Sequence, residues 1–296
     1  MTADEADVGA GVQPTDSDPA SLTESATTSD VRRERGSVRH RASVWIPPIL
    51  VAMLFVGIWY LISFLLGKRN FLLPYPDVVV AKGFLDPGTF NDILTALGRT
   101  AEVALVGLAI AIVFGVLWAI AMSQARWVER SLFPYAVILQ CIPILALVPL
   151  IGFWFGFEFF SRVVVCVMIA LFPMVSNTLF GLQSVDRSQR ELFQLQQASR
   201  FTVLTKLELP TALPAIFAGM RISAGLAVVG AIVGDFFFRR GTPGIGSLLS
   251  TYTSRLQGAE LIATIIAASF LGVAIFVLFG WIGRLAVGRW YDYGAK

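Results

Sequence analysis

The chain has 296 residues, of which 56% are hydrophobic and only 15% are charged, and its mean hydropathy is +0.72. Because a soluble domain carries about 25% charged residues, this composition excludes an ordinary cytosolic enzyme and a disordered protein, and it indicates a membrane bundle. The net charge of +3 gives no reason to expect nucleic acid as a partner. Cys141 and Cys166 lie in apolar segments and are expected to be packing residues. With one histidine in the chain, no metal site is predicted.

The first 43 residues differ from the rest of the chain. Residues 1–31 contain seven acidic residues, no basic residue and no apolar periodicity, which predicts a disordered tail. A basic cluster between Arg32 and Arg41 follows, directly before the first apolar segment. It is either a lipid-head-group anchor or regulatory tail, or a topology signal that holds this end in the cytoplasm, and the second interpretation is favoured. A cleaved signal peptide is not predicted, because the cluster begins too far from residue 1.

Six apolar segments are long enough to cross about 30 Å of hydrocarbon as helices. They are residues 44–66, 100–122, 132–157, 163–182, 212–234 and 261–283. Barrel strands are excluded, because membrane strands have about 10 residues and alternate in polarity. The predicted fold class is therefore all-α, a polytopic membrane protein with six transmembrane helices. The membrane domain is predicted at residues 44–286, between the cytoplasmic tails 1–43 and 287–296.

The distribution of Lys and Arg predicts the orientation. With the N-terminus inside, the inside segments hold 14 basic residues and the outside segments hold 8. This bias predicts that both termini are cytoplasmic.

Proline and glycine interrupt several predicted spans. The third and fourth spans contain Pro134, Pro143, Pro149 and Pro173. Each proline removes a backbone donor and is expected to bend its helix. Gly152/Gly156 and Gly230/Gly234 have the small-xxx-small spacing that lets helices approach closely. Ordinary bundle packing explains these features, although bent spans also suit a transporter.

Residues 183–211 form a polar loop that is much longer than the usual connection of about 5 residues. Residues 188–199 are rich in helix formers and predict one short helix. Residues 202–209 carry Val203, Leu204 and Leu207 at helical spacing and predict a second, before Pro210 opens the fifth span. Two such helices on the cytoplasmic face would give a soluble partner a surface to grip.

This loop resembles the coupling loop of binding-protein-dependent ABC importer permeases. The family pattern is Glu-Ala-Ala, three residues, Gly, nine residues, an aliphatic residue, one residue and Leu-Pro, which ends here at Leu209–Pro210 and places Glu191 and Leu207 on its Glu and aliphatic positions. The departures are Leu192 and Phe193 at the alanines and Gln197 at the glycine. Because that glycine turns the chain between the two helices, its loss predicts a different turn or a modified groove on the partner.

A wider resemblance covers residues 71–252. Its motifs are residues 71–76 (FLLPYP), 142–150 (IPILALVPL), 154–156 (WFG), Pro173 with Asn177, Thr178 and Gly181, 219–221 (GMR) and 244–246 (GIG). In this order and spacing they resemble the nitrate/sulfonate/taurine-type permeases, a branch that includes importers of vitamin precursors. The solute implied is a sulfonate- or nitrate-like anion or a vitamin precursor, and nothing in the chain distinguishes these.

The resemblance implies a transport subunit of the bacterial plasma membrane that is not an enzyme. It implies two copies of the permease, most simply a homodimer in the lipid bilayer, two ABC ATPase subunits and an extracytoplasmic substrate-binding protein. The chain has no Gly-x4-Gly-Lys-Ser/Thr loop, so ATP and Mg are expected on the ATPase, with no cofactor on this chain. The implied coupling residues are Glu191, Gln197, Ser199, Leu204, Leu207, Leu209 and Pro210. Glu191 is either a polar contact to the ATPase or a solvated helix residue. Leu204 and Leu207 are expected to form the apolar seat of the ATPase, the surface on which it packs.

Polar residues within spans and glycines in the outer loop are the candidates for a pathway or gate. They are Gln140, Ser176, Asn177, Arg221, Asp235, Gly244 and Gly246. For Gln140, Ser176 and Asn177 the alternative is hydrogen bonding between helices, and for Arg221 a structural role is favoured. Residues 68–99, 158–162 and 235–260 are either docking segments for the binding protein or ordinary solvated loops.

Two other classes compete with the permease. A secondary transporter or channel usually shows paired broken helices around an ion site, and the long polar loop would have no purpose in it. A membrane enzyme would need a cluster of His, Asp, Glu or Cys, whereas the only histidine is in the tail and the carboxylates are scattered.

Overall fold

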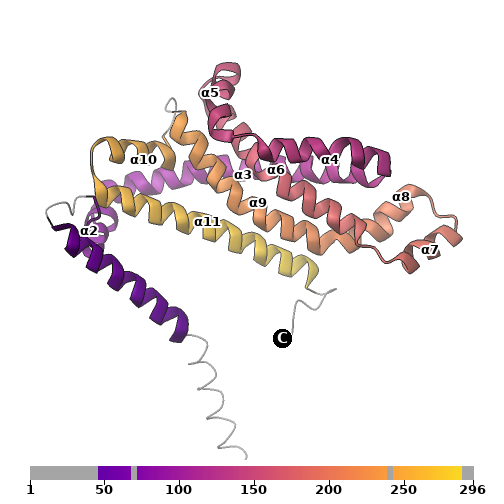
Figure 1. Cartoon of the computed structure of the whole chain (residues 1–296), viewed down its shortest axis with the longest axis horizontal. Helices are drawn as coiled ribbons and strands as arrows, with labels where there is room; N and C mark the ends of the chain where they lie inside the picture. The colour runs from indigo at the N-terminus through magenta and orange to yellow at the C-terminus, as the bar shows by residue number, and fades with distance from the viewer. Residues whose placement is uncertain (1–45, 68–71, 239–242, 289–296) are drawn as a thin grey trace, which may run out of the picture. The chain divides into compact units, whose positions relative to one another are not determined.

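The computed structural model describes residues 46–67, 72–238 and 243–288, and within these ranges all regular secondary structure is helical (Figure 1). The chain divides into two units, Met1–Leu61 and Ile62–Lys296. The helix Ile46–Leu66 begins in the first unit and is the counterpart of the predicted span 44–66. The predicted N-terminal tail, 1–43, lies outside the described residues. Of the predicted C-terminal tail, 287–296, only residues 287 and 288 are described.

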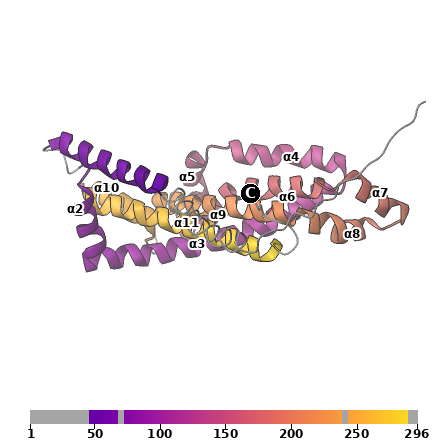
Figure 2. The same ribbon diagram turned by 90° about the horizontal axis from the view of Figure 1, so that it is seen from below.

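The second unit contains the remaining helices. In chain order they are α2 (Pro76–Val80), the π-helical turn η2 (Ala81–Leu85), α3 (Pro87–Ser123), α4 (Arg126–Cys141), α5 (Ile144–Phe155), α6 (Phe159–Gln183), α7 (Arg187–Leu195), α8 (Arg200–Val203), the π-helical turn η3 (Leu204–Glu208), α9 (Leu209–Phe237), α10 (Ile245–Ser254) and α11 (Gly258–Val287). In both views α7 and α8 lie at one end of this unit, and α2 and α10 lie at the other (Figures 1 and 2). We call these the loop end and the far end.

Five helices among the described residues are long and apolar enough to cross a membrane, and a sixth crossing is obtained if α4 and α5 count as one bent span. The predicted fold class, an all-α polytopic membrane protein, is confirmed. Helices α3, α6, α9 and α11 are longer than the predicted spans. Helix α3 starts at Pro87 rather than at residue 100, because Asp86 caps its first turn and accepts a 2.9 Å hydrogen bond from the Thr89 N–H. That bond lowers the pKa of the Asp86 carboxyl.

The third apolar segment does not form one continuous helix, and the bend expected at Pro143 is confirmed. Its helices α4 and α5 meet at a bend of 97°. The break falls at Ile142 and Pro143, whose ψ angles of 127° and 94° are both extended. A residue before proline is disfavoured in the α region, and proline itself has no N–H to continue the ladder. By contrast, Pro134, Pro149 and Pro173 are accommodated inside helices.

The bent pair nevertheless carries the chain from one end of the bundle to the other. Met122 in the last turn of α3 packs in one cluster with Leu182 in the last turn of α6, so α4 begins where α6 ends. Beyond α5, the ring of Phe157 packs against Phe238 at 5.9 Å, directly before α6 begins. Helices α4 and α5 together therefore run in the direction opposite to α6.

Helices α3, α6 and α9 form the centre of the bundle, and small residues let them approach closely. Cys166 of α6 is fully buried and lies against Gly107 of α3 and Gly230 of α9. A Cβ on Gly230 would lie 2.8 Å from the Cα of Cys166, and one on Gly234 would lie 3.2 Å from the Cα of Arg162. The predicted close-packing role of the pair Gly230/Gly234 is confirmed. Cys166 is a buried packing residue, as predicted, whereas Cys141 is exposed.

The fifth span starts earlier than predicted. Residues 202–209 do not form a separate short helix, because α8, η3 and α9 run on as one helix, Arg200–Phe237, of 38 residues. Pro210 has no N–H to donate to the preceding turn. The preceding turn is widened to the π pattern, in which the Leu209 N–H bonds to the Leu204 carbonyl, so the helix continues through the proline.

Candidate functional site

Helix α7 is the polar element that projects at the loop end (Figure 1). It ends with the hydrogen bonds of a Schellman motif, from the Gln197 N–H to the Gln194 carbonyl at 2.9 Å and from the Ala198 N–H to the Phe193 carbonyl at 3.0 Å. Gln197 takes the left-handed position of this motif, with a φ of +50°. The chain therefore makes, with glutamine, the kind of turn for which glycine is the usual residue.

An ion pair fixes α7 to the base of the long helix. Arg190 Nη2 lies 3.1 Å from Glu208 Oε1, and the Glu208 side chain is almost entirely buried. Glu191, by contrast, pairs at 2.9 Å with Arg187 of its own helix, and both side chains are exposed. Glu191 is thus available to a partner, while Arg190 and Glu208 hold α7 in place.

The leucines expected to form an apolar seat for a partner face inward instead. Leu207 is only 8% exposed, and Leu204 and Leu209 pack against the cluster that contains Met122 and Leu182. Leu207 is thus buried and Leu204 half-buried, and the apolar seat for the ATPase expected from Leu204 and Leu207 stays a prediction. On α7 and α8 the exposed large apolar side chains are Leu192, Leu195 and Phe201, with Leu195 83% and Phe201 73% exposed.

The remaining coupling candidates shape the backbone. Ser199 caps α8, and its Oγ accepts a 3.2 Å hydrogen bond from the Thr202 N–H. Pro210 lies in the first turn of α9. Next to them, Arg200 Nη1 donates to the Gln124 carbonyl at 3.2 Å and joins the long helix to the end of α3. A cavity of about 380 Å³ opens here, lined by Ser123, Gln124, Arg190, Gln194, Ala198, Arg200, Val203 and Glu208.

At the far end, Asp235 is buried and forms an ion pair with Arg162 of α6 at 3.0 Å. Its carboxylate also accepts hydrogen bonds from the Gly244 N–H at 3.2 Å and the Ser247 N–H at 2.7 Å. Gly244 lies close to Thr100 and Asp235, and Gly246 lies against the backbone of α9. Three residues predicted for a gate are thus brought together where α10 starts.

The other pathway candidates are scattered. Gln140 is exposed on α4. Ser176 Oγ and Asn177 Nδ2 donate to the Pro173 carbonyl of their own helix, at 3.3 and 2.7 Å. Arg221 lies 4.1 Å above the ring of Phe276 in a cation–π contact with α11, which agrees with a structural role.

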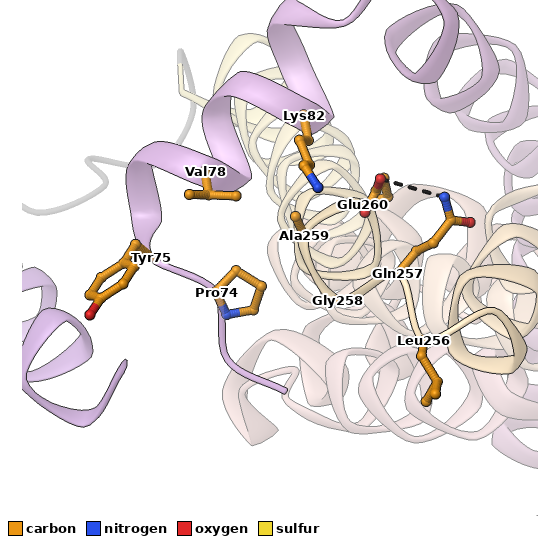
Figure 3. A pocket seen from close by; sticks show the side chains of 9 residues that line it. All are labelled: Pro74, Tyr75, Val78, Lys82, Leu256, Gln257, Gly258, Ala259 and Glu260. Carbon is orange, nitrogen blue, oxygen red and sulfur yellow. Dashed lines mark hydrogen bonds between the residues drawn. The ribbon is translucent and has the colours of Figure 1, made fainter. Parts of the chain in front are cut away.

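Two of the segments predicted for docking meet at a second cavity, of about 370 Å³, at the far end (Figure 3). Pro74, Tyr75, Val78 and Lys82 line one side, and residues 256–260 line the other. Gln257 Nε2 donates to Glu260 Oε1 at 3.5 Å. Leu256, at the rim, has a φ of +56°.

Three residues of these sites, Arg162, Arg190 and Glu208, were not predicted from the sequence, whereas Asp235 was predicted as a gate candidate. Arg190 and Glu208 are 18 positions apart, and Arg162 and Asp235 are 73 apart, so their spacing carries no signal. The solitary charge of Asp235 after a long apolar segment was the one available clue. Within the described ranges, no group of three or more His, Cys, Asp or Glu residues is placed to hold a metal ion.

The helices are long and apolar enough to cross a membrane, and a buried ion pair between such helices is typical of a functional site in a membrane protein. Residues 111–290 match the family described as the binding-protein-dependent transport system inner membrane component, and the chain belongs to this family. It is an ABC importer permease of the nitrate/sulfonate/taurine branch, an inner-membrane protein of a transport system and not an enzyme.

Named relatives support this assignment. The chain is 33% identical over 230 residues to the formylaminopyrimidine transport permease protein ThiX of Halalkalibacterium halodurans, covering 77% of this chain and 90% of that protein. It is 30% identical to the riboflavin transport system permease protein RibX of Chloroflexus aurantiacus, covering 80% and 87%. It is 26% identical to the nitrate import permease protein NrtB of Synechococcus elongatus, covering 87% and 95%.

Proposed function

We propose that this chain is the membrane-spanning subunit of an ATP-driven importer, and that residues 187–208 couple it to a separate ATPase. The observation that carries the proposal is the exposed apolar surface of Leu192, Leu195 and Phe201 on otherwise polar helices at the loop end. Exposed apolar side chains within a polar surface are typical of protein interfaces, where a few buried anchors supply most of the binding energy.

The mounting of α7 fits this role. A helix that transmits force has to be fixed to the bundle, and the Arg190–Glu208 ion pair and the Schellman turn at Gln197 supply two attachments. The exposed pair Arg187–Glu191 contributes little to stability. Glu191 can therefore exchange Arg187 for a partner's donor at little cost.

The assembly we propose has two copies of this chain as a homodimer, two ATPases that bind ATP and Mg, and a substrate-binding protein at the far end. The loop end then faces the cytoplasm, together with both termini. The solute is a small anion of the nitrate or sulfonate kind or a vitamin precursor. The names of the relatives, which transport formylaminopyrimidine, riboflavin and nitrate, support this range.

Affinity purification in mild detergent, followed by mass spectrometry, tests the proposal. We expect a stoichiometric ATPase with a phosphate-loop motif, lost on Leu195→Glu and weakened on Glu191→Lys. The matched control is Leu72→Glu, which places the same charge on an exposed leucine away from the loop. An ATPase that stays bound to both loop variants would contradict the coupling role. A chain that purifies alone and transports in liposomes without ATP would instead indicate a secondary transporter.

A further inference from the structure

The start of α10 is held by a dense set of polar contacts to two other helices. Asp235 of α9 binds the N–H groups of Gly244 and Ser247 with its two carboxylate oxygens. The Ile245 N–H donates to Thr100 Oγ1 of α3 at 3.0 Å. The free N–H groups at the start of a helix are thereby satisfied by side chains from elsewhere in the bundle, and a carboxylate at this position is also favoured by the helix dipole.

Arg162 completes this joint. The Arg162 and Asp235 side chains are 5% and 3% exposed. Arg162 uses Nη1 for the carboxylate and donates from Nη2 to the Phe238 carbonyl at 2.9 Å, which fixes the end of α9. Because removing one partner of a buried ion pair leaves an uncompensated charge, these contacts are expected to hold or break together.

Close packing makes the joint stiff. A Cβ on Gly246 would fall on the Ile232 carbonyl and the Phe236 amide of α9, so α10 touches the α9 backbone directly. A Cβ on Gly244 would lie 2.8 Å from Thr100 Oγ1. At Gly246 no side chain separates α10 from α9, and at Gly244 only the short side chains of Thr100 and Asp235 lie in between.

The helix that carries Asp235 begins next to α7. It runs without interruption from Arg200 to Phe237, and 38 residues span about 57 Å at 1.5 Å per residue. Arg190 of α7 pairs with Glu208 near its start, and Asp235 holds α10 near its end. One helix therefore links α7, through the Arg190–Glu208 ion pair, to α10, through the hydrogen bonds that the Asp235 carboxylate accepts from Gly244 and Ser247.

We propose that Arg162 and Asp235 are positioning residues that make α10 move with α9, so that a displacement of α7 by the ATPase is transmitted to α10 at the far end. This inference rests on the proposed function. Neither residue has to touch the solute, because their role is to join two helices. The linkage makes the position of α10 respond to the nucleotide state of the ATPase at the loop end.

The test measures the exposure of α10 in two nucleotide states. Thr253→Cys places a thiol on an exposed position of α10, in a Cys141→Ser background because Cys141 is exposed. The full chain, bound to its ATPase in nanodiscs, is labelled with a membrane-impermeant maleimide without nucleotide and with ATP plus vanadate. We expect the two rates to differ by about tenfold, within the range typical of coupled sites.

The joint is then broken without leaving an unpaired charge. In the double variant Arg162→Gln/Asp235→Asn we expect ATPase binding to persist and the ratio of the two rates to fall to about one. Thr100→Val, which removes one acceptor and no charge, should lower the ratio partway. The matched control is Ser223→Ala, which removes a buried 2.7 Å hydrogen bond between α9 and α6 but leaves the joint intact, and should keep the ratio of the parent.

An assembled double variant that keeps the full ratio would overturn the inference. So would a parent complex that shows ATP-dependent uptake but the same Thr253→Cys labelling rate in both states. If no ATPase binds the parent chain at all, the proposed function itself is refuted. That outcome is recognised before any labelling is done.

Discussion

Gln197 and Leu256 occupy the same position at two helix ends. Both have positive φ, at +50° and +56°, and both follow the capping residue of a Schellman motif, in which the Ala198 and Gln257 N–H groups bond back to Phe193 and Tyr252. A left-handed conformation costs a residue other than glycine about 1–2 kcal/mol. The loop end and the far end each contain one such strained turn.

Replacing Gln197 with glycine should stabilise its turn. The relief of left-handed strain is partly offset by the greater freedom of glycine in the unfolded chain, about 0.5–1 kcal/mol, so we expect a net gain of up to about 1 kcal/mol. Hydrogen exchange of residues 192–199 should slow. The matched control is Gln196→Gly, where φ is −77° and glycine should only destabilise. Faster exchange in Gln197→Gly would show that the glutamine side chain itself holds the turn.

Gly246→Ala should disrupt the far end. The added methyl group meets the backbone of α9, which cannot rotate away as a side chain can, and overpacking of this kind costs about 1–3 kcal/mol. Gly225→Ala is the control, because its Cβ would find its nearest neighbour, Phe276 Cδ2, at 4.0 Å. Thermal denaturation followed by size-exclusion chromatography should show a lower melting temperature only for Gly246→Ala. Equal melting temperatures would mean that α10 is not seated on α9.

At the scale of elements, the attachment of α7 depends on one ion pair. Arg190→Ala would leave Glu208 largely buried without its partner, a change that costs about 1–3 kcal/mol. We expect faster hydrogen exchange in α7 and reduced ATP-dependent uptake. Arg187→Ala should change neither, because Arg187 is fully solvated and its pair with Glu191 is exposed. Similar effects of the two variants would show that hydrogen exchange and uptake depend on the charge near α7 rather than on the Arg190–Glu208 attachment.

Most helices were predictable, because a long apolar segment in lipid has to satisfy its backbone hydrogen bonds internally, as a helix does. What each proline does was not predictable. Pro143 breaks a helix, whereas Pro173 is tolerated inside α6 and Pro210 is absorbed by a π turn. The difference depends on tertiary packing. Similarly, the motif located Glu191 but missed Arg190, because the partly exposed Arg190 meets the buried Glu208 only once the chain has folded.

At the scale of the whole molecule, the bent pair α4–α5 decides the topology. If the pair crosses the membrane, the chain crosses six times and both termini lie on the same side. If the pair enters and returns on the same side, the chain crosses five times and the termini lie on opposite sides. In the second case α7 would lie on the side opposite the N-terminus. The path of the chain past Phe157 and Phe238 favours a crossing.

Thiol labelling of intact cells decides between these topologies. In the Cys141→Ser background we expect Thr253→Cys on α10 to react with an impermeant maleimide, and Leu195→Cys on α7 to react only after the membrane is permeabilised. The 14 to 8 distribution of basic residues predicts that a tag at the N-terminus is protected together with Leu195→Cys. A protected tag with a reactive Leu195→Cys would show that α4–α5 re-enters. The helix Arg200–Phe237 separates the two reporters. Labelling of both in intact cells would therefore mean that this helix does not cross the membrane, and it would contradict the assignment of α7 to the ATPase.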